Sequence, residues 1–416
     1  MAIGLWSLTL AQIRAHRFLF FMAAAIFALV VAQLTPLPAS IWHAVPGREL
    51  AAQIDRTALG QNIWRPITMT PFATWNAFFG LLVPLAVLIL GVQMSRDQNT
   101  KLLSVLLALC GVSGLIGLLQ VIGSAESPLF FYEVTNFGAA VGLFANRNHQ
   151  AILLSTVFPM LVVFVHAGKN GRGDNNVRLW LAIAGAGILI PLLLVTGSRS
   201  GLLLGLLGIG AAALLTRQSM AADRASGDTQ VKNKTTIMRY AIVGGLSVVL
   251  AIVTALVSRA EAISRLLDSD EMNGARLPMW VTGWDLARKY FPFGAGFGSI
   301  TTVFEIDQPK GNLAPTYVNH LHNDWLETLV SGGLPAVLLM VIAAVAWSRA
   351  SSACFRTKAR SGSDLMLAKL GSIVTLIFVL GSFVDYPLRT PSIACVFALA
   401  AVWLSGSGQR SANNDC

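Results

Sequence analysis

The sequence predicts an all-α integral membrane protein that crosses the bilayer about ten times, and three observations support this prediction. Hydrophobic residues make up 55% of the 416 residues, charged residues make up 12%, and the mean hydropathy is +0.65. These values lie far outside the range of ordinary soluble domains. Apolar runs long enough to cross about 30 Å of hydrocarbon recur along the chain. The basic residues, finally, are distributed unevenly between the segments that separate those runs.

Ten apolar runs fit a membrane-spanning helix by length and composition. The first could instead be a cleaved signal peptide, but it lacks a small-x-small cleavage site and is long for such a segment, so we interpret it as a retained span. Together the runs predict a single membrane domain over residues 1–416. They lie near residues 18–34, 72–94, 102–122, 148–167, 179–197, 200–216, 239–258, 329–348, 366–384 and 391–405.

The basic residues predict a cytoplasmic amino terminus. In that orientation 18 Lys and Arg residues and six acidic residues fall on the cytoplasmic side, whereas 12 basic and 14 acidic residues fall outside. The cytoplasmic segments then carry a net charge of +12 and the outer segments −2, in agreement with the positive-inside rule. The total charge of +10 therefore reflects topology and implies no nucleic-acid partner.

The segments between the runs differ between the two sides. The longest cytoplasmic segment, 217–238, has the composition of a flexible basic linker. The outer side carries loops at 34–71 and 123–146 and a large periplasmic loop at 259–328, between the seventh and eighth spans. The chemistry of the protein is therefore expected on the outer side.

The large outer loop contains a predicted interfacial helix. Pro278 fits the first turn of a helix, and Trp280 and Trp284 follow at helical spacing. Tryptophans at this spacing are typical of an amphipathic helix at the membrane surface. The stretch GAGFGS at 294–299 follows no predicted strand, so it indicates a turn that needs a flexible backbone rather than a dinucleotide-binding loop.

Several arginines on the outer side stand where a helix is predicted to begin. Arg147, Arg199 and Arg389 directly precede or open the fourth, sixth and tenth spans. Each helix starts outside, so its positive dipole end faces the same space as its arginine. Backbone amides together with these guanidinium groups and that of Arg276 indicate an anion site. Arginines at span ends are also typical of snorkelling anchors, and that interpretation remains open.

The stretch HLHNDWLETLVSGGLPA at 320–336 carries the sharpest candidate. Asn319 or Asn323 is expected to cap the helix entering the eighth span, with His322 over its first turns. An imidazole in the headgroup zone can accept a proton from an attacking hydroxyl. A capping or interfacial role is the alternative for His322. Neighbouring histidines at 320 and 322 do not share a helix face, so no metal is expected here.

The ordered set of motifs resembles the O-antigen ligase and polymerase superfamily of bacterial inner membranes. The motifs are GLFANRNHQA at 142–151, TGSRSG at 196–201, Arg276 followed by the tryptophan helix and PFGAGFGS, NHLHNDWLETLVSGGLPA at 319–336, and FVDYPLRTPS at 383–392. One departure is Ser331, where many relatives carry an acidic residue, so the resemblance supports no carboxylate role at that position.

The resemblance implies a glycosyltransferase of the multi-pass inner membrane, with its site facing the periplasm and no cofactor. The donor would be a glycan on undecaprenyl diphosphate, and the acceptor a lipid A core or another glycan. The transfer would be metal-independent and inverting, with His322 as general base and arginines holding the diphosphate. The catalytic residues implied are His322, Arg199 and Arg276, and the substrate-binding residues implied are Arg147, Asn148, His149, His320, Asn323, Asp385 and Arg389.

Two other functions remain open at this point. A polymerase of O-antigen or exopolysaccharide repeats would use the same donor with a different acceptor. A transporter of an anionic or lipid-linked solute would require ionisable residues near midmembrane, broken helices and internal repeats. The spans carry almost no such charge and show no repeat, which favours the enzyme.

Overall fold

The computed structural model describes residues 2–59, 63–123, 126–168, 175–225, 270–310, 317–357 and 363–406. Within these ranges the protein is almost entirely helical, and the only sheet is a pair of two-residue antiparallel strands, β1 (Pro36–Leu37) and β2 (Arg65–Pro66). The predicted all-α polytopic membrane fold is confirmed.

Eight helices in the described ranges are long and apolar enough to cross a membrane, and each coincides with a predicted span. The tenth predicted span is the shorter apolar helix α17 (Pro391–Ser405), and the seventh, 239–258, lies outside the described residues. The eight are α3 (Arg17–Leu34), α6 (Pro71–Gly91), α7 (Arg96–Ile122), α8 (Arg147–Gly168), α9 (Asn175–Val195), α10 (Arg199–Ala225), α15 (Asp324–Arg356) and α16 (Ser363–Gly381).

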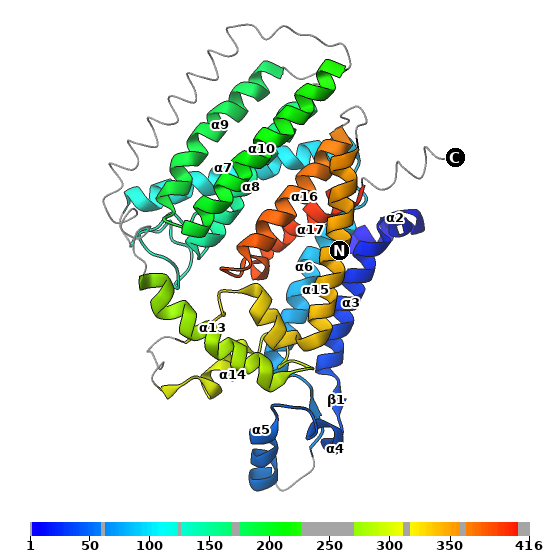
Figure 1. The fold of residues 1–416 in the computed structure, drawn as a ribbon, viewed down its shortest axis with the longest axis vertical. Helices are drawn as coiled ribbons and strands as arrows, with labels where there is room; N and C mark the ends of the chain where they lie inside the picture. The colour runs from blue at the N-terminus through cyan, green and yellow to red at the C-terminus, as the bar shows by residue number, and fades with distance from the viewer. Residues whose placement is uncertain are drawn as a thin grey trace. The chain divides into compact units, whose positions relative to one another are not determined.

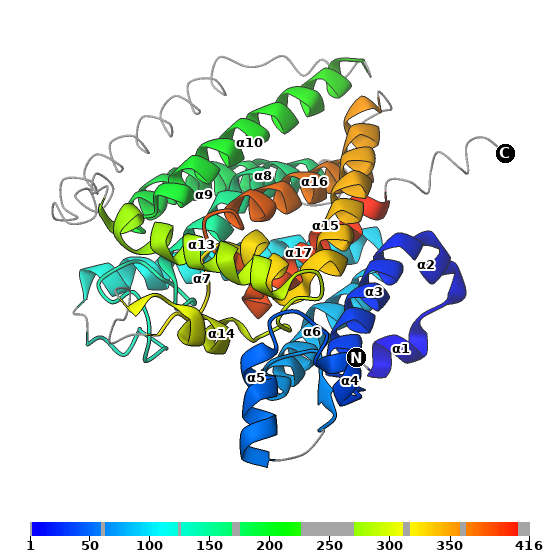
Figure 2. The same cartoon turned by 60° about the horizontal axis from the view of Figure 1, so that its bottom comes forward.

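The chain divides into two compact units, each described here by itself. The first unit combines Met1–Val92, Ser269–Arg349 and Ser382–Ala398, and the second combines Gln93–Asp268, Ala350–Gly381 and Leu399–Cys416. Besides α3, α6 and parts of α15 and α17, the first unit contains α1 (Ala2–Ser7), α2 (Leu10–Ala15), α4 (Ala39–Trp42), α5 (Glu49–Ile54), η1 (Asp55–Leu59), α13 (Asp270–Tyr290), α14 (Ile300–Asp307) and η3 (Pro387–Arg389) (Figures 1 and 2).

In the second unit, α8 packs against α7, α9, α10 and α16. Helix α7 begins with a capping box, because the Ser95 hydroxyl accepts from the N–H of Gln98 while the Gln98 side chain accepts from the N–H of Ser95. Helix α10 continues to Ala225, so the first part of the predicted linker 217–238 is helical; its remainder lies outside the described residues. The alanines of that stretch favour helix.

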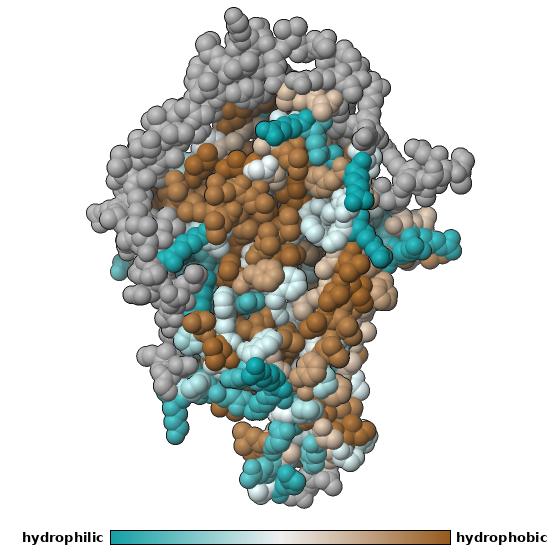
Figure 3. Space-filling model, in the orientation of Figure 1, coloured by the Kyte–Doolittle hydropathy of each residue, from teal (hydrophilic) through white to brown (hydrophobic). Residues whose placement is uncertain are grey.

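In the first unit, the surface of α3 is apolar. Phe21 and Val31 are exposed, and Figure 3 shows hydrophobic side chains covering this helix. Its other side packs against α6, where the rings of Phe27 and Phe78 meet edge to face at 5.3 Å. Exposed apolar side chains on a helix of this length are what contact with lipid tails requires.

Helix α15 is interrupted at Gly333. This residue has φ 60° and ψ −152°, a conformation open almost only to glycine, and Pro335 follows it. The break frees backbone groups that the helix would otherwise pair. The N–H of Leu334 donates to the carbonyl of Pro292, and the N–H of Ala295 donates to that of Val330, both at 2.8 Å. Non-helical backbone of this kind is tolerated in a membrane protein where protein groups satisfy it.

The GAGFGS turn is the partner of this break. Gly294, Gly296 and Gly298 all have positive φ, which confirms the predicted need for a flexible backbone. The N–H of Gly296 donates to the carbonyl of Ser331 at 2.9 Å. Gln33 of α3 completes the junction: its Nε2 donates to the same carbonyl at 2.8 Å and its Oε1 accepts from the N–H of Phe297 at 3.0 Å.

Arg48 fastens the first outer loop to the same turn. The side chain is fully buried, and its guanidinium donates to the carbonyls of Pro46, Ile67 and Gly294. The guanidinium also lies 5.2 Å from the ring centre of Tyr290. Burial lowers the pKa of Arg48 to about 10, so the group stays charged at neutral pH. A buried charge with these partners fixes the loop in place.

An ion pair in the first outer loop makes stability depend on pH. The guanidinium of Arg65 binds both carboxylate oxygens of Asp55, and its hydrogen bonds hold the pKa of that buried carboxyl below its usual value of about 3.9. The pair therefore contributes stability above that pH, and the contribution is lost as the pH falls through the lowered pKa. We expect the unfolding temperature in detergent to fall more steeply below about pH 4 for the wild type than for Asp55→Asn. Parallel curves would contradict this.

One prediction about the large outer loop is wrong. Pro278 lies inside α13 and not in its first turn, because the helix already begins at Asp270. Proline lacks an N–H, so it removes one helical hydrogen bond at that position. The predicted tryptophan helix itself is present over Asp270–Tyr290. Whether it lies at a membrane interface stays a prediction, as does the single-domain organisation.

Candidate functional site

His322 stands directly before helix α15 in an unusual backbone conformation. Its φ is 50°, and it is the only described residue other than glycine with a positive φ. Such conformations are strained for most side chains and gather at functional sites. Asn323 follows as the helix cap, since its Oδ1 accepts from the N–H of Leu326 at 3.0 Å. Of the two predicted caps, the structure thus has Asn323, and His322 lies just before the first turn of the helix.

The imidazole of His322 faces a buried carboxylate. Its Nδ1 lies 3.3 Å from Oδ1 of Asp385, a distance suited to an ion pair, although the two groups are not aligned for a hydrogen bond. The side chain of His322 is 30% exposed whereas that of Asp385 is fully buried. Because Nδ1 is itself buried, the exposed area belongs to the rest of the ring. Asp385 can therefore orient an imidazole whose far edge meets solvent.

Two further groups contact Asp385. The N–H of Tyr386 donates to its Oδ1 at 2.9 Å. Nη2 of Arg276 lies 3.9 Å from its Oδ2, and Nη1 of the same guanidinium donates to the carbonyl of the neighbouring Val384 at 3.0 Å. Arg276, His322 and Asp385, all predicted as site residues, are thus brought together.

A second imidazole and carboxylate pair lies beside the first. Nδ1 of His320 lies 2.9 Å from Oε1 of Glu327, which is 1% exposed. The N–H of Leu321 donates to the other oxygen, Oε2, at 2.9 Å. Tyr386 contacts both imidazoles, with ring centres 4.2 Å from His320 and 5.0 Å from His322. His320 is therefore fixed by protein contacts.

Arg389 joins this second pair to a third carboxylate. Its Nε lies 3.0 Å from Oδ1 of Asp324 and 3.2 Å from Oε1 of Glu327. The other oxygen of Asp324 accepts from the hydroxyl of Ser382 at 3.0 Å and from the N–H of Leu388 at 3.3 Å. Arg389 was predicted to bind substrate, and the structure places it among carboxylates.

These eight residues form what we call the imidazole–carboxylate cluster. Its two guanidinium groups face three carboxyl groups. All of its members belong to the first unit. An imidazole beside a carboxyl group suits the removal of a proton from a hydroxyl. The cluster consists of Arg276, His320, His322, Asp324, Glu327, Asp385, Tyr386 and Arg389.

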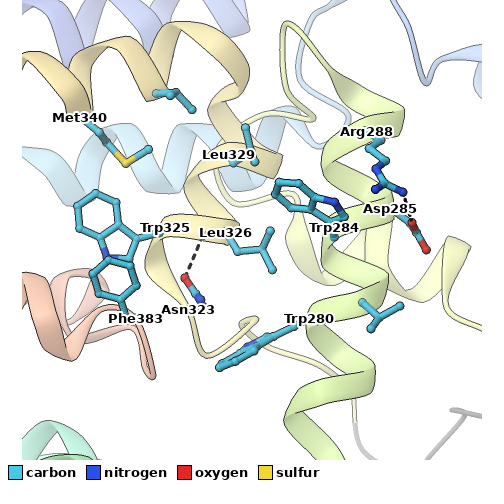
Figure 4. A pocket seen from close by; sticks show the side chains of 12 residues that line it. Trp280, Trp284, Asp285, Arg288, Asn323, Trp325, Leu326, Leu329, Met340 and Phe383 are labelled. Carbon is cyan, nitrogen blue, oxygen red and sulfur yellow. Dashed lines mark hydrogen bonds and ion pairs between the residues drawn. The ribbon is translucent and has the colours of Figure 1, made fainter.

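An apolar groove begins beside the cluster, at Asn323. It has a volume of about 650 Å³ and lies between α13 and the first turns of α15. Figure 4 shows Trp280 and Trp284 of α13 on one side and Trp325 stacked on Phe383 on the other, with ring centres 5.2 Å apart. Such a groove can accept a hydrocarbon chain next to a polar site.

The remaining predicted residues lie in the second unit. Arg147 and Arg199 open α8 and α10, as expected, and their side chains are partly exposed. The nearby helix-start amides have side-chain caps, because the N–H of Asn148 donates to Asn146 at 2.8 Å and that of Gly201 donates to Ser198 at 3.0 Å. These two amides are thus not open for an anion.

His149, predicted to bind substrate, is 4% exposed, and its ring meets Phe144 edge to face at 6.5 Å. It is therefore packed in the interior of its unit. Asn148, the third residue predicted in this stretch, is partly exposed. The part that Arg147, Asn148 and Arg199 play in substrate binding stays a prediction.

Sequence reasoning missed three members of the cluster: Asp324, Glu327 and Tyr386. One sequence signal could have indicated Glu327. Side chains in the first turn of a helix point toward its amino terminus, so Glu327, in a helix that starts at Asp324, points toward the segment that contains His320. Tyr386 is adjacent to Asp385, but its contact with both imidazoles depends on the fold.

Comparison with known families supports the resemblance. Residues 184–341 match a family model described as O-antigen ligase. The match includes Arg199, Arg276 and the stretch from His320 through the break at Gly333. A comparison with curated proteins gave no match.

Proposed function

The chain belongs to the O-antigen ligase and polymerase superfamily, and from this premise we propose that it transfers a glycan from undecaprenyl diphosphate to a lipid A core or similar acceptor. The family indicates an enzyme of the glycosyltransferase type that acts on lipid-linked glycans in a membrane. We place the reaction on the periplasmic face of the inner membrane because the positive-inside rule puts His322 outside. The observation that carries the proposal is the partly exposed imidazole of His322 against the buried carboxylate of Asp385.

In the proposed reaction the acceptor hydroxyl attacks the anomeric carbon of the donor sugar. The exposed edge of His322, at Nε2, takes the hydroxyl proton while Asp385 stabilises the imidazolium that forms. A new glycosidic C–O bond forms as the bond from the anomeric carbon to the diphosphate oxygen breaks, and undecaprenyl diphosphate leaves with that electron pair. Attack from the side opposite the leaving group inverts the anomeric centre.

The charge on the leaving diphosphate must also be stabilised. We assign this role to Arg199 and Arg276, which can bind phosphate oxygens as well as a metal ion would, so the proposal includes no metal. The side chain of Arg276 is 22% exposed, and it lies 3.9 Å from Asp385 of the cluster. The polyprenyl chain would lie in the groove between α13 and α15, where tryptophan and leucine side chains replace lipid as its surroundings.

A polymerase of O-antigen or exopolysaccharide repeats is the alternative, because it would use the same donor and the same base. The two differ in the acceptor that occupies the open side of the cluster. Transport of a lipid-linked solute is disfavoured by the family match and by the position of the ionisable groups before α15.

The proposed function is tested by deleting the gene in its native host and measuring three pools: undecaprenyl-linked glycan, its chain length, and glycan on the final acceptor. A ligase predicts long chains retained on undecaprenyl and none on the acceptor. A polymerase predicts single repeats in place of long chains. Complementation with the wild-type gene must restore each pool. Unchanged pools in a strain with no second copy would contradict both enzymatic proposals.

A further inference from the structure

Arg389 raises a question that the proposed reaction does not answer. It stands before a membrane helix on the predicted outer side, which suits a phosphate ligand, yet its Nε contacts two carboxylates. Its side chain is 21% exposed, while those of Asp324 and Glu327 are 11% and 1% exposed. An unpaired buried charge is strongly destabilising. The main role of a guanidinium between two nearly buried carboxylates is therefore to neutralise their charge.

The two carboxylates that Arg389 contacts organise the backbone around His322. Glu327 binds the imidazole of His320 and the N–H of Leu321, so it fixes the two residues before His322. Asp324 binds the hydroxyl of Ser382 and the N–H of Leu388. Its own N–H donates to the carbonyl of Ser382 at 2.9 Å.

These contacts connect the two segments of the first unit that carry the proposed base and its partner. One segment, 320–327, contains His322, and the other, 382–389, contains Asp385. The hydrogen bonds of the Asp324 side chain run between the two segments, and Arg389 closes the connection by binding carboxylates of the first from the end of the second. Loss of the charge on Arg389 would leave two carboxylates without their counter-charge at this junction.

We propose that Arg389 is a positioning residue: it neutralises the Asp324 and Glu327 pair, thereby keeps His322 against Asp385, and does not bind the diphosphate. The inference rests on the proposed function, and it removes Arg389 from the phosphate ligands that the sequence suggests. Stabilising the negative charge of the donor diphosphate is then the proposed role of Arg199 and Arg276 alone. The role of Arg389 is exerted through Asp324 and Glu327, not through contact with substrate.

Charge-balanced variants separate the two roles. Arg389→Gln alone removes the counter-charge, and we expect it to lower kcat by about 100-fold and to lower the unfolding temperature. In the double variant Arg389→Gln with Asp324→Asn, one carboxylate is neutral, and the new amide oxygen can accept from both Ser382 and Leu388, as Oδ2 of Asp324 does. We expect the double variant to recover at least about tenfold of the lost kcat and most of the lost stability.

The assay uses the full-length protein in detergent, with lipid-linked glycan extracted from the host as donor and the host acceptor as second substrate. A positioning role predicts that KM for the donor stays within about threefold of wild type in the double variant, because no phosphate contact has been removed. A phosphate ligand predicts a KM at least about tenfold higher and no recovery of kcat. That result would overturn the proposal.

The unfolding temperature keeps the test independent of the proposed function. Recovery of the unfolding temperature in the double variant would show that Arg389 stabilises the protein by neutralising Asp324 and Glu327. That conclusion holds even if the protein catalyses a reaction other than the proposed transfer. No recovery of stability, with each protein monodisperse, would count against the counter-charge itself. A wild-type protein that transfers no glycan under conditions where a known ligase does would count against the proposed function and leave the stability comparison to decide the role of Arg389.

Discussion

We expect the variant His322→Asn to transfer glycan about 1,000-fold more slowly than the wild type, because it removes the proposed general base. Asparagine is the suitable replacement since it tolerates the left-handed backbone that His322 adopts at φ 50°. Alanine at this position would add backbone strain to the loss of the base. The measurement is the initial rate of transfer by purified protein from lipid-linked glycan, with kcat and KM separated.

The matched control is His320→Asn. An asparagine amide can donate to Oε1 of Glu327 from about the place where Nδ1 of His320 stands. We expect this variant to stay within about tenfold of wild type, since the contact that fixes the segment is retained. If His320→Asn were as inactive as His322→Asn, the second imidazole would be the base or both would be needed. If His322→Asn were fully active, the proposed base would be wrong.

The second large effect is expected from Gly333→Ala. A Cβ at this position would stand 2.1 Å from the carbonyl oxygen of Pro292, and the backbone has φ 60° and ψ −152°. The carbonyl of Pro292 accepts a hydrogen bond from the N–H of Leu334, so it cannot move away from the new Cβ without breaking that bond. We expect a loss of about 3 kcal/mol or more in the free energy of unfolding, or failure to accumulate in the membrane.

Gly80→Ala provides the control for that substitution. Gly80 lies within α6 of the same unit, and a Cβ there would meet no atom within 4 Å. We expect this variant to be as stable as the wild type, because alanine is the better helix former. Yield and unfolding temperature in detergent compare the two. Equal behaviour of both variants would show that α15 can straighten at Gly333.

The membrane helices were predictable from sequence for a simple physical reason. A span needs a continuous apolar run of known length, and that requirement is local. Among the described residues, each apolar run therefore predicted its helix to within a few residues except in α7, α10 and α15, which extend further. Asn323 was predictable as a cap because its side chain serves the backbone three residues away. Arg147 and Arg199 stand at helix starts for the same local reason.

The contacts of the cluster were not predictable in this way. Arg389 is separated from Asp324 by 65 positions, and nothing in either local pattern indicates that they meet. Arginine before a helix suggested an anion ligand, and the fold supplied carboxylates from another segment instead. Pro278 misled for a related reason, since proline favours a first turn but is tolerated further along. At Arg389, contacts between distant segments determined the structure, and at neither Arg389 nor Pro278 did the local preference of the residue type predict it.

The junction at Gln33 has a consequence for the order in which the protein is made. The amide of this side chain binds residues 264 and 298 positions later in the chain. At about 5 to 20 residues per second, its last partner is synthesised roughly 15 to 60 s after it. The first unit also needs residues up to Ala398, whereas most of the second is the continuous segment Gln93–Asp268. The unit that carries His322 therefore cannot be completed before Ala398 has been synthesised.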